Sequence, residues 1–201
     1  MDKFVYINIR EYLVYDNSSE IGEADLKTAV SDFFCPRNPD VEKFLKRNAV
    51  EFTKKHQSVT YLVFSNEDGE LVGYFTIAIK PITVNASSVS NTVKRKLQRI
   101  SRLDEDTGTY TASAFLIAQL GKNFARNLNE RISGEELLDM AWMVVKELQY
   151  AAGGIVTFLE AEKKEKLLDF YHENGFREFD IKIVKNIEDK PYELVQLLKI
   201  M

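Results

Sequence analysis

The runs FLIAQLGK (115–122), NERISGEELL (129–138) and LDFYHENGF (168–176) carry the strongest indication of the fold, and together they span residues 115–176. The first run is almost continuously apolar, which is typical of a central strand covered on both faces. The last run ends in Asn-Gly, which commonly stops a helix. Together with an apolar run at 155–160, this order predicts strand, loop, helix, strand and helix.

The loop at 121–133 leads from the first strand into a helix with a marked start. Ser133 and Glu136 have the spacing of a capping box, in which each side chain bonds the backbone N–H of the other residue. The first amides of a helix lack intrahelical partners and favour anions such as phosphate. Many strand-to-helix connections share these features, and Glu135 and Glu136 add negative charge there. The loop alone therefore does not establish an anion site.

Two side chains late in the stretch are candidates for acid–base chemistry. Tyr171 has a phenol, with a reference pKa of about 10, so at neutral pH it could protonate a departing thiolate. Its alternative role is a half-buried tyrosine on an amphipathic helix. Glu160 ends a strand and could order an amine or a water that acts as base. It could equally cap the turn at Lys163 and Lys164.

The remaining sequence is expected to add strands and helices around this stretch. Asn38 and Pro39 predict an N-cap and first position of a helix whose apolar face carries Val41, Phe44, Leu45, Asn48 and Phe52. The Asp68-Gly69 turn predicts a hairpin. The polar segment 85–106 is expected to be a short amphipathic helix or a mobile excursion. Strands are predicted at 4–14, 60–65, 71–80, 109–120, 181–184 and 192–200, helices at 24–34 and 162–173, and a turn at 16–22.

Composition limits the class of protein. The chain has 201 residues, a net charge of −4 and one cysteine, so it cannot form an internal disulfide or a usual Cys/His zinc site. The net charge gives no whole-molecule attraction to nucleic acid. The N-terminus lacks the apolar run of a signal peptide, and no run reaches the ~20 apolar residues of a membrane span. We expect a soluble, cytoplasmic protein that does not contact a membrane.

The LDFYHENGF segment resembles the FYxxxGF segment of the GNAT-superfamily N-acetyltransferases, and LIAQLGK (116–122) resembles their central strand. The resemblance implies a single GNAT-like domain over 1–201. Its fold would be mixed α/β, with a twisted, mostly antiparallel sheet, helices on both faces, and central strands at 109–120 and 155–160 that splay apart.

The resemblance also implies a site for acetyl-CoA as acyl donor. Tyr171 would be the general acid toward the coenzyme A thiolate. The backbone of three residues would hold the pantetheine arm and the thioester carbonyl: Leu120, Gly121 and Lys122. The pyrophosphate loop would comprise Asn129, Arg131, Ile132, Ser133 and Gly134, with Ile132 standing where the family has its first glycine.

The implied function is transfer of an acetyl group to a primary amine by direct attack, with Glu160 as the candidate base. The acceptor is open: a small amine, a peptide or a protein. One alternative is acetylation of aminoacyl-tRNA, because FCPRNPDVEKFL (34–45) is similar to the toxin-like branch of the family, although the net charge does not favour tRNA. A second alternative is a non-catalytic GNAT-like scaffold. The sequence also leaves a homodimer open.

Overall fold

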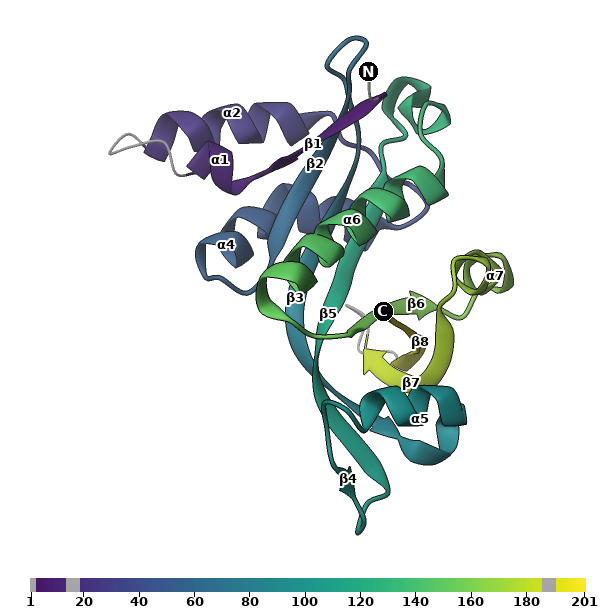
Figure 1. Cartoon of the computed structure of the whole chain (residues 1–201). Helices are drawn as coiled ribbons and strands as arrows, with labels where there is room; N and C mark the ends of the chain where they lie inside the picture. Colours follow the sequence, from purple (N-terminus) through teal and green to yellow (C-terminus); the bar gives the residue numbers. More distant parts are fainter. Residues whose placement is uncertain (1–2, 14–18, 186–190) are drawn as a thin grey trace. The chain divides into compact units, whose positions relative to one another are not determined.

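The computed structural model describes residues 3–13, 19–185 and 191–201 (Figure 1). The chain forms two compact units, each assembled from separate segments. The first unit comprises Met1–Ala78 and Ile117–Lys146, and the second comprises Ile79–Leu116 and Glu147–Met201. The expected single domain over 1–201 stays a prediction.

Helices and strands alternate along the chain, with helices dominating the N-terminal part and strands the C-terminal end. In chain order they are β1 (Phe4–Asn8), α1 (Arg10–Leu13), α2 (Ser19–Ser31), α3 (Pro39–Lys43), the π-helix η1 (Phe44–Asn48), α4 (Ala49–Lys54), β2 (Val59–Ser65), β3 (Leu71–Asn85), the 3₁₀-helix η2 (Ala86–Ser88), α5 (Asn91–Leu97), β4 (Leu103–Asp104), β5 (Thr109–Lys122), the 3₁₀-helix η3 (Ala125–Glu130), α6 (Gly134–Ala152), β6 (Val156–Glu162), α7 (Glu165–Glu173), β7 (Arg177–Lys185) and β8 (Pro191–Ile200).

The strands form one open sheet in the order β1-β2-β3-β5-β6-β8-β7, with β4 paired to β5. The sheet is mostly antiparallel, and β5 and β6 are its parallel pair. The parallel register consists of Phe115 opposite Thr157 and Leu116 opposite Phe158. By contrast, β6 pairs with β8 along its whole length, from Val156 to Glu162. The predicted mixed α/β class with a mostly antiparallel sheet is confirmed, and the splaying of the central strands stays a prediction.

Helices cover both faces of the sheet within the first unit. Adjacent strand residues point to opposite faces. A Cβ at Gly73 would lie 3.3 Å from the Leu137 side chain of α6. The next residue, Tyr74, stacks edge-on against Phe33 and donates a 2.6 Å hydrogen bond to the carbonyl of Val41 in α3. Therefore α6 packs on one face, and α3 with the chain that follows α2 packs on the other.

The N-terminal strand is shorter than its sequence suggests. Residues 4–14 were expected to be one strand, but β1 ends at Asn8 and α1 begins at Arg10. The Asn8 side chain accepts a hydrogen bond from the Arg10 N–H at 2.9 Å, which starts a helical turn in place of an extended continuation. The turn expected at 16–22 is also wrong where it can be compared, because 19–22 belong to α2; its remaining residues lie outside the described part.

The helix expected from Pro39 is confirmed at its start, where Val41 and Leu45 are buried as predicted, and its predicted apolar face is wrong at the C-terminal end. The Asn38 side chain accepts from the N–H groups of Asp40 and Val41, as predicted for an N-cap. The next turn, η1, is a π-helix, whose hydrogen bonds span one residue more than those of an α-helix, so the residues after it are rotated about the helix axis. Ala49 and Thr53 are consequently buried, whereas Phe52, placed on the apolar face from the α-helical spacing, is 37% exposed.

The second unit has its own core and confirms two predicted elements. Segment 85–106 contains the amphipathic helix α5, whose buried Leu97 joins an apolar cluster with Ile82, Val84 and Tyr110. β7 and β8 are an antiparallel pair and contain the strands expected at 181–184 and 192–200. Over the described ranges, none of the helices has the length and hydropathy of a membrane span.

Candidate functional site

The loop that was expected to bind phosphate is held by one buried amide side chain, Asn123. Its Oδ1 accepts hydrogen bonds from the N–H groups of Phe34 and Ala125, each at 3.0 Å, and its Nδ2 donates to the Leu71 carbonyl at 2.9 Å. Asn123 is 2% exposed, so these bonds replace water at three backbone groups. Asn123 thereby fixes where β5 ends and the loop begins. The sequence did not identify this role, because two of the three partners of Asn123, Phe34 and Leu71, are remote from it in the chain.

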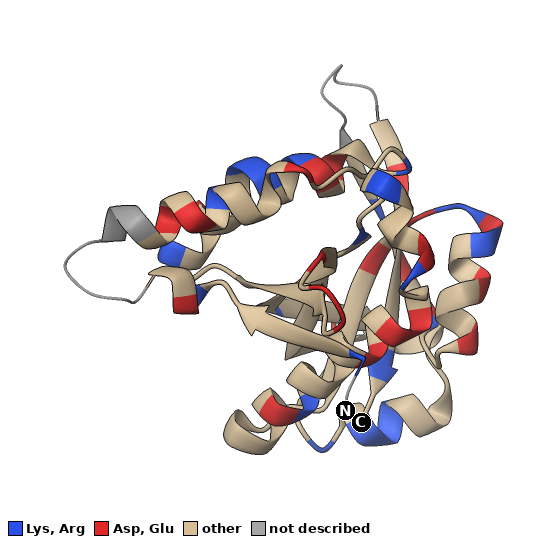
Figure 2. Ribbon diagram, turned by 90° about the horizontal axis from the view of Figure 1, so that it is seen from above, with Lys and Arg blue, Asp and Glu red and all other residues tan. Residues whose placement is uncertain are grey.

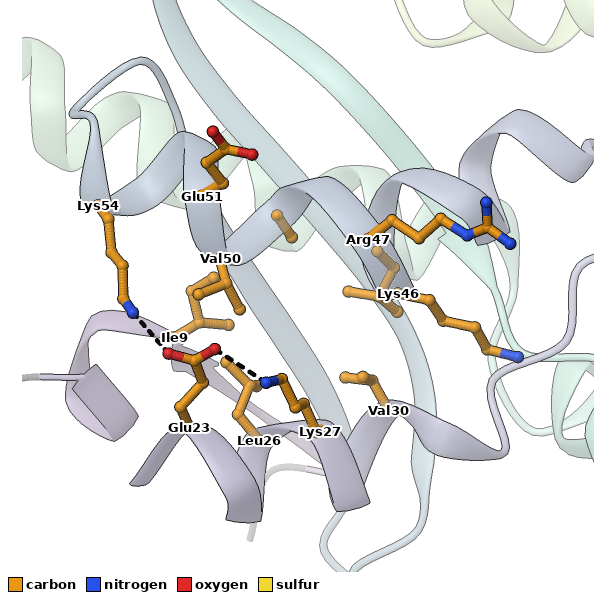
Figure 3. A pocket seen from close by; sticks show the side chains of 12 residues that line it. Ile9, Glu23, Leu26, Lys27, Val30, Lys46, Arg47, Val50, Glu51 and Lys54 are labelled. Carbon is orange, nitrogen blue, oxygen red and sulfur yellow. Dashed lines mark hydrogen bonds and ion pairs between the residues drawn. The ribbon is translucent and has the colours of Figure 1, made fainter. Parts of the chain in front are cut away.

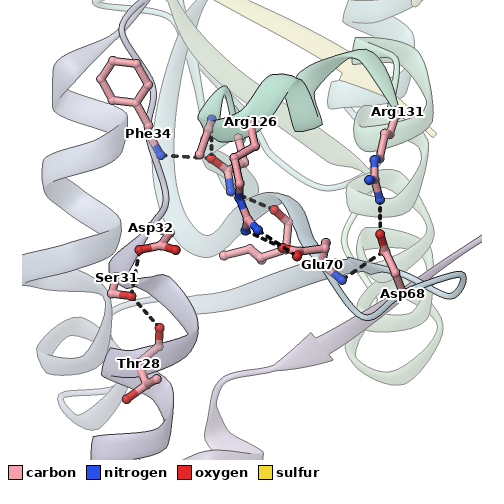
Figure 4. Close-up of polar contacts among 11 residues, drawn as sticks. Thr28, Ser31, Asp32, Phe34, Asp68, Glu70, Arg126 and Arg131 are labelled. Atoms are coloured by element: carbon pink, nitrogen blue, oxygen red, sulfur yellow. Dashed lines mark hydrogen bonds and ion pairs between the residues drawn. The ribbon is translucent and has the colours of Figure 1, made fainter.

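Two arginines tie the same loop to the β2–β3 turn (Figure 4). Arg126 makes a bidentate pair with Glu70, at 3.0 and 2.7 Å, and Arg131 pairs with Asp68. Arg126 and the next residue, Asn127, both have positive φ, 49° and 61°, which is uncommon outside glycine. Arg131, expected to contact pyrophosphate, is thus engaged by a carboxylate, and the hydrogen bond from Arg131 holds the pKa of Asp68 below its usual value.

The start of α6 forms the predicted capping box. The Ser133 N–H donates to Glu136 Oε2 at 2.7 Å, and the Glu136 N–H donates to Ser133 Oγ at 3.0 Å. The second carboxylate oxygen of Glu136 lies 3.3 Å from Lys3 Nζ. The hydrogen bond from the Ser133 N–H is the main cause that holds the pKa of Glu136 below its usual value. The Ser133 side chain and Lys3 make smaller contributions in the same direction. The Ser133 N–H, which was expected to face phosphate, therefore donates its hydrogen bond to the carboxylate of Glu136.

Lys122 and Ile132, two predicted contacts of the acyl donor, meet in the first unit. Lys122 Nζ donates to the Ile132 carbonyl at 2.7 Å. Ile132 is 1% exposed, so its side chain fills the core and does not cover the outer side of the loop. Burial, with a smaller contribution from the nearby Arg37 cation, lowers the pKa of Lys122. Two cations thus lie near one another beside the loop, which favours an anion there.

Gly121 is a glycine for a packing reason. A Cβ at this position would lie 2.4 Å from Val41 Cγ1 and 3.2 Å from the Tyr74 ring. Leu120 beside it is half-buried, as is Asn129 of the loop, while Gly134 opens α6. The absence of a side chain at Gly121 therefore brings the end of β5 against α3. It does not by itself indicate a ligand.

Tyr171 lies on α7 in the second unit. It is 9% exposed and packs against the rings of Phe170 and Phe176, with centroids 5.1 and 6.0 Å away. Burial raises the pKa of Tyr171 to about 12. The phenol is therefore protonated throughout the neutral range, as a general acid must be before it acts. Gly175, with φ of 84°, ends the helix as its sequence predicted.

Glu160, the candidate base, has a different environment from either predicted one. Both of its carboxylate oxygens accept from Lys182 Nζ at 3.0 Å, and Oε1 also accepts from Gln196 Nε2 at 2.8 Å. The alternative role as a cap for the following turn is wrong, because Lys163 pairs with Glu193 and Lys164 with Glu162. A carboxylate held by an ammonium is better suited to orienting a group than to taking its proton.

The predicted residues thus fall into two sets. Leu120, Gly121 and Lys122 and the loop residues belong to the first unit, where Lys122 contacts Ile132. Tyr171 and Glu160 belong to the second unit and have separate partners. The meeting of the two sets at one acetyl-CoA molecule stays a prediction.

A cavity of about 350 Å³ lies in the first unit between α2 and the η1–α4 segment (Figure 3). Its apolar lining includes Leu26 and Val50. Glu23 at its rim is held between Lys27 and Lys54, and Lys46 is paired with Glu42. Of the cations between residues 43 and 55, three are therefore paired with a glutamate: Lys46, Lys54 and Lys55. Both signs of charge are spread over the whole molecule (Figure 2), consistent with its small net charge.

Solved structures resemble this chain over nearly its whole length, whereas sequence comparisons find no relative. No protein-family model and no curated sequence matches the chain. Among solved structures, AtaT complexed with acetyl-methionyl-tRNAfMet is 18% identical, with a TM-score of 0.65 over 98% of this chain and 94% of that one. A Tyr-to-Phe mutant of KacT is 18% identical, with a TM-score of 0.61 over 99% and 95%.

A third solved structure, a Tyr-to-Phe mutant of the AtaT toxin bound to acetyl-CoA and to the C-terminus of the antitoxin AtaR, is also 18% identical. Its TM-score is 0.56 over 99% of this chain and 94% of that one. At these identities the likeness concerns the fold. The chain has the GNAT-like acyl-CoA N-acyltransferase fold that its sequence predicted.

Proposed function

We propose that this protein transfers an acetyl group from acetyl-CoA to the amino group of an aminoacyl-tRNA. The observation that carries the proposal is the match, over nearly all of both chains, to AtaT complexed with acetyl-methionyl-tRNAfMet. A neighbour bound to acetyl-CoA supports the donor. The tRNA acceptor was an alternative at the level of sequence, and these likenesses favour it over a small amine or a peptide.

Acetyl-CoA supplies a thioester carbonyl that an amine can attack directly. A C–N bond forms, the C–S bond breaks, the amine loses a proton and the departing sulfur gains one. Tyr171 is the proposed proton donor to sulfur, because its phenol remains protonated until its pKa of about 12. After transfer, the phenolate regains a proton from solvent. Such a general acid typically contributes ~10²–10⁴-fold in rate.

The donor is proposed to lie along the end of β5 and the start of α6. The backbone of Leu120, Gly121 and Lys122 would hold the pantetheine arm and the carbonyl oxygen. Lys122 supplies positive charge, and its pairing with the Ile132 carbonyl orients it toward the loop. The carboxylate of Glu136 opposes phosphate at this helix start, so binding there requires Glu136 to leave the Ser133 amide.

Glu160 is proposed to orient the acceptor side and to leave deprotonation to water. Its contacts with Lys182 and Gln196 support this role, because they use the carboxylate oxygens that a base would need. A Glu160→Gln variant should therefore lose less turnover than a Tyr171→Phe variant. A larger loss in the Gln variant would assign the proton transfer to Glu160.

The deciding experiment measures transfer of radiolabelled acetyl from acetyl-CoA to methionyl-tRNA and to a mixture of other aminoacyl-tRNAs. Uncharged tRNA and free methionine serve as acceptor controls. We expect label only on charged tRNA, released as acetyl-amino acid after mild alkaline hydrolysis of the ester. Acetylation of free amines with none on charged tRNA would contradict the acceptor and keep the acetyltransferase. No transfer to any acceptor would contradict both.

A further inference from the structure

The surface that remains strongly charged lies in the second unit, on α5 and the turn after it. Residues 79–103 include six Lys and Arg and no Asp or Glu, in a chain whose net charge is −4. Carboxylates next appear at Asp104, the last residue of β4, and at Glu105 and Asp106 in the turn that follows. The α5 basic surface is defined by the five cations of α5 and the segment after it: Lys94, Arg95, Lys96, Arg99 and Arg102.

The orientation of this surface is fixed by its apolar side. Leu97 is fully buried, and Val93 packs against the same cluster as Ile82 and Val84. Ser90 caps the helix, accepting from the Val93 N–H at 3.3 Å. Because one side of α5 is anchored in the core, the charged side faces outward. The surface is therefore presented by folded structure.

Three arginines are exposed on this surface. Arg95 lies in α5, Arg99 in the turn that follows the helix, and Arg102 directly before β4. The turn is held to the helix by two hydrogen bonds, from the Arg99 N–H to the Lys96 carbonyl at 3.2 Å and from the Ser101 N–H to the Leu97 carbonyl at 2.9 Å. The three guanidinium groups are thus carried by α5 and by the segment attached to its end.

These cations differ from the other charged segments in their lack of acidic partners. Among the described residues, no ion pair joins Lys94, Arg95, Arg99 or Arg102 to a side-chain carboxylate, and Lys96 Nζ donates to the Met201 oxygen at 3.3 Å. In the 43–55 segment, by contrast, Lys46, Lys54 and Lys55 are each paired with a glutamate. The α5 basic surface therefore combines dense positive charge with freedom from internal neutralisation.

We propose that the α5 basic surface binds the phosphate backbone of the RNA that carries the acceptor. The inference rests on the proposed function, which supplies a polyanion as substrate, and it assigns the contact to residues other than those proposed for acyl transfer. Arginines suit RNA because guanidinium groups bind phosphates in a bidentate manner. The surface provides affinity independent of base sequence, since phosphate contacts do not read bases.

The test compares two triple variants with the same change in charge. Arg95→Gln/Arg99→Gln/Arg102→Gln removes the three exposed arginines of the α5 basic surface, and Lys146→Gln/Lys163→Gln/Lys166→Gln removes three exposed cations elsewhere. Uncharged tRNA binding is measured by fluorescence anisotropy at several salt concentrations. The arginine variant should bind about 10-fold or more weakly, with a log–log salt slope smaller by about 2–3. The lysine variant should match the wild type.

Each other outcome is decisive. If both variants bind tRNA as the wild type does, the surface assignment is wrong while the proposed function stands. If binding is lost with the arginines although charged tRNA is never acetylated, the surface stands and the acceptor chemistry is wrong. If polyglutamate of matched charge competes as well as tRNA, the surface serves an acidic protein and the inference is overturned. Thermal unfolding of all variants confirms that they are folded.

Discussion

At the scale of single residues, Tyr171 is protonated at neutral pH, as the proposed proton donor to sulfur must be before it acts. Burial against Phe170 and Phe176 excludes water and disfavours the phenolate. Replacing Tyr171 with Phe keeps the ring and removes the hydroxyl. We expect turnover to fall by ~10²-fold or more, with acetyl-CoA affinity nearly unchanged. Steady-state kinetics and calorimetry with acetyl-CoA measure the two effects separately, and unchanged turnover would remove Tyr171 from the chemistry.

The raised pKa of Tyr171 also predicts how stability depends on alkaline pH. In the unfolded chain the phenol ionises near its reference pKa of about 10, whereas in the folded protein it ionises near 12. The contribution is complete below pH ~10 and is lost as pH rises toward 12, because the unfolded state releases its proton first. Urea unfolding between pH 9 and 12 should show a smaller alkaline loss for Tyr171→Phe than for the wild type. Equal losses would mean that the phenol ionises freely in the folded state.

Glu136 is the residue that most directly opposes an anion at the start of α6. Glu136→Gln keeps an acceptor for the Ser133 N–H while removing the charge. Helix-terminus charges contribute about 0.3–1 kcal/mol, so acetyl-CoA should bind roughly 2–5-fold more tightly. Glu135→Gln is the matched control, because Glu135 is exposed in the same turn and is not the residue that caps Ser133.

Calorimetry with acetyl-CoA measures the gain in affinity of the Glu136→Gln and Glu135→Gln variants. A larger gain for Glu136→Gln than for Glu135→Gln would show that the capping carboxylate competes with phosphate for the amide. Equal gains would show a general effect of charge in the first turn. No change in either variant would place the phosphates elsewhere.

At the scale of elements, the end of β5 is positioned by the absence of a side chain at Gly121. Gly121→Ala would place its Cβ 2.4 Å from Val41 Cγ1, and a β-branched side chain on a helix cannot easily turn away. We expect a loss of about 1–3 kcal/mol in the free energy of unfolding. Val41→Ala removes the clashing methyl, so the double variant should lose less than the sum of the single losses, with coupling of about 0.5–3 kcal/mol. Additive losses in urea unfolding would show that the two elements do not meet there.

At the scale of the whole molecule, binding of acetyl-CoA separates an enzyme from a scaffold that has lost its ligand. A ligand at 100 times its dissociation constant stabilises the folded state by about 2.7 kcal/mol. For a chain of this length, this corresponds to a rise of roughly 5–10 °C in melting temperature. Differential scanning calorimetry with acetyl-CoA, and with acetate as control, measures the shift. No shift at millimolar acetyl-CoA would favour the non-catalytic alternative.

The extent of prediction from sequence can be judged from particular elements. The capping box of Ser133 and Glu136 was predicted because its partners are three residues apart, and the Asp-Gly hairpin because its turn chemistry is local. The buried face of the helix after Pro39 was predicted correctly at Val41 and Leu45 and wrongly at Phe52, since the π-helical turn between them leaves no periodic signal. The pairing of Glu160 with Lys182 was also missed, because β8 separates them in the sheet.

The sequence indicated the order of most elements through short-range periodicity and capping, and it indicated the fold class and the candidate Tyr171 through the resemblance of its LDFYHENGF segment to a known family. Only the tertiary contacts decided which charged side chains are left without an ion-pair partner and so remain available to a ligand. Ion pairs such as Arg131 with Asp68 and Glu160 with Lys182 join residues remote in the sequence, and they neutralise groups that look free in it. The α5 basic surface stands out only after that pairing is known, because electrostatic attraction depends on distance in space and not on separation along the chain.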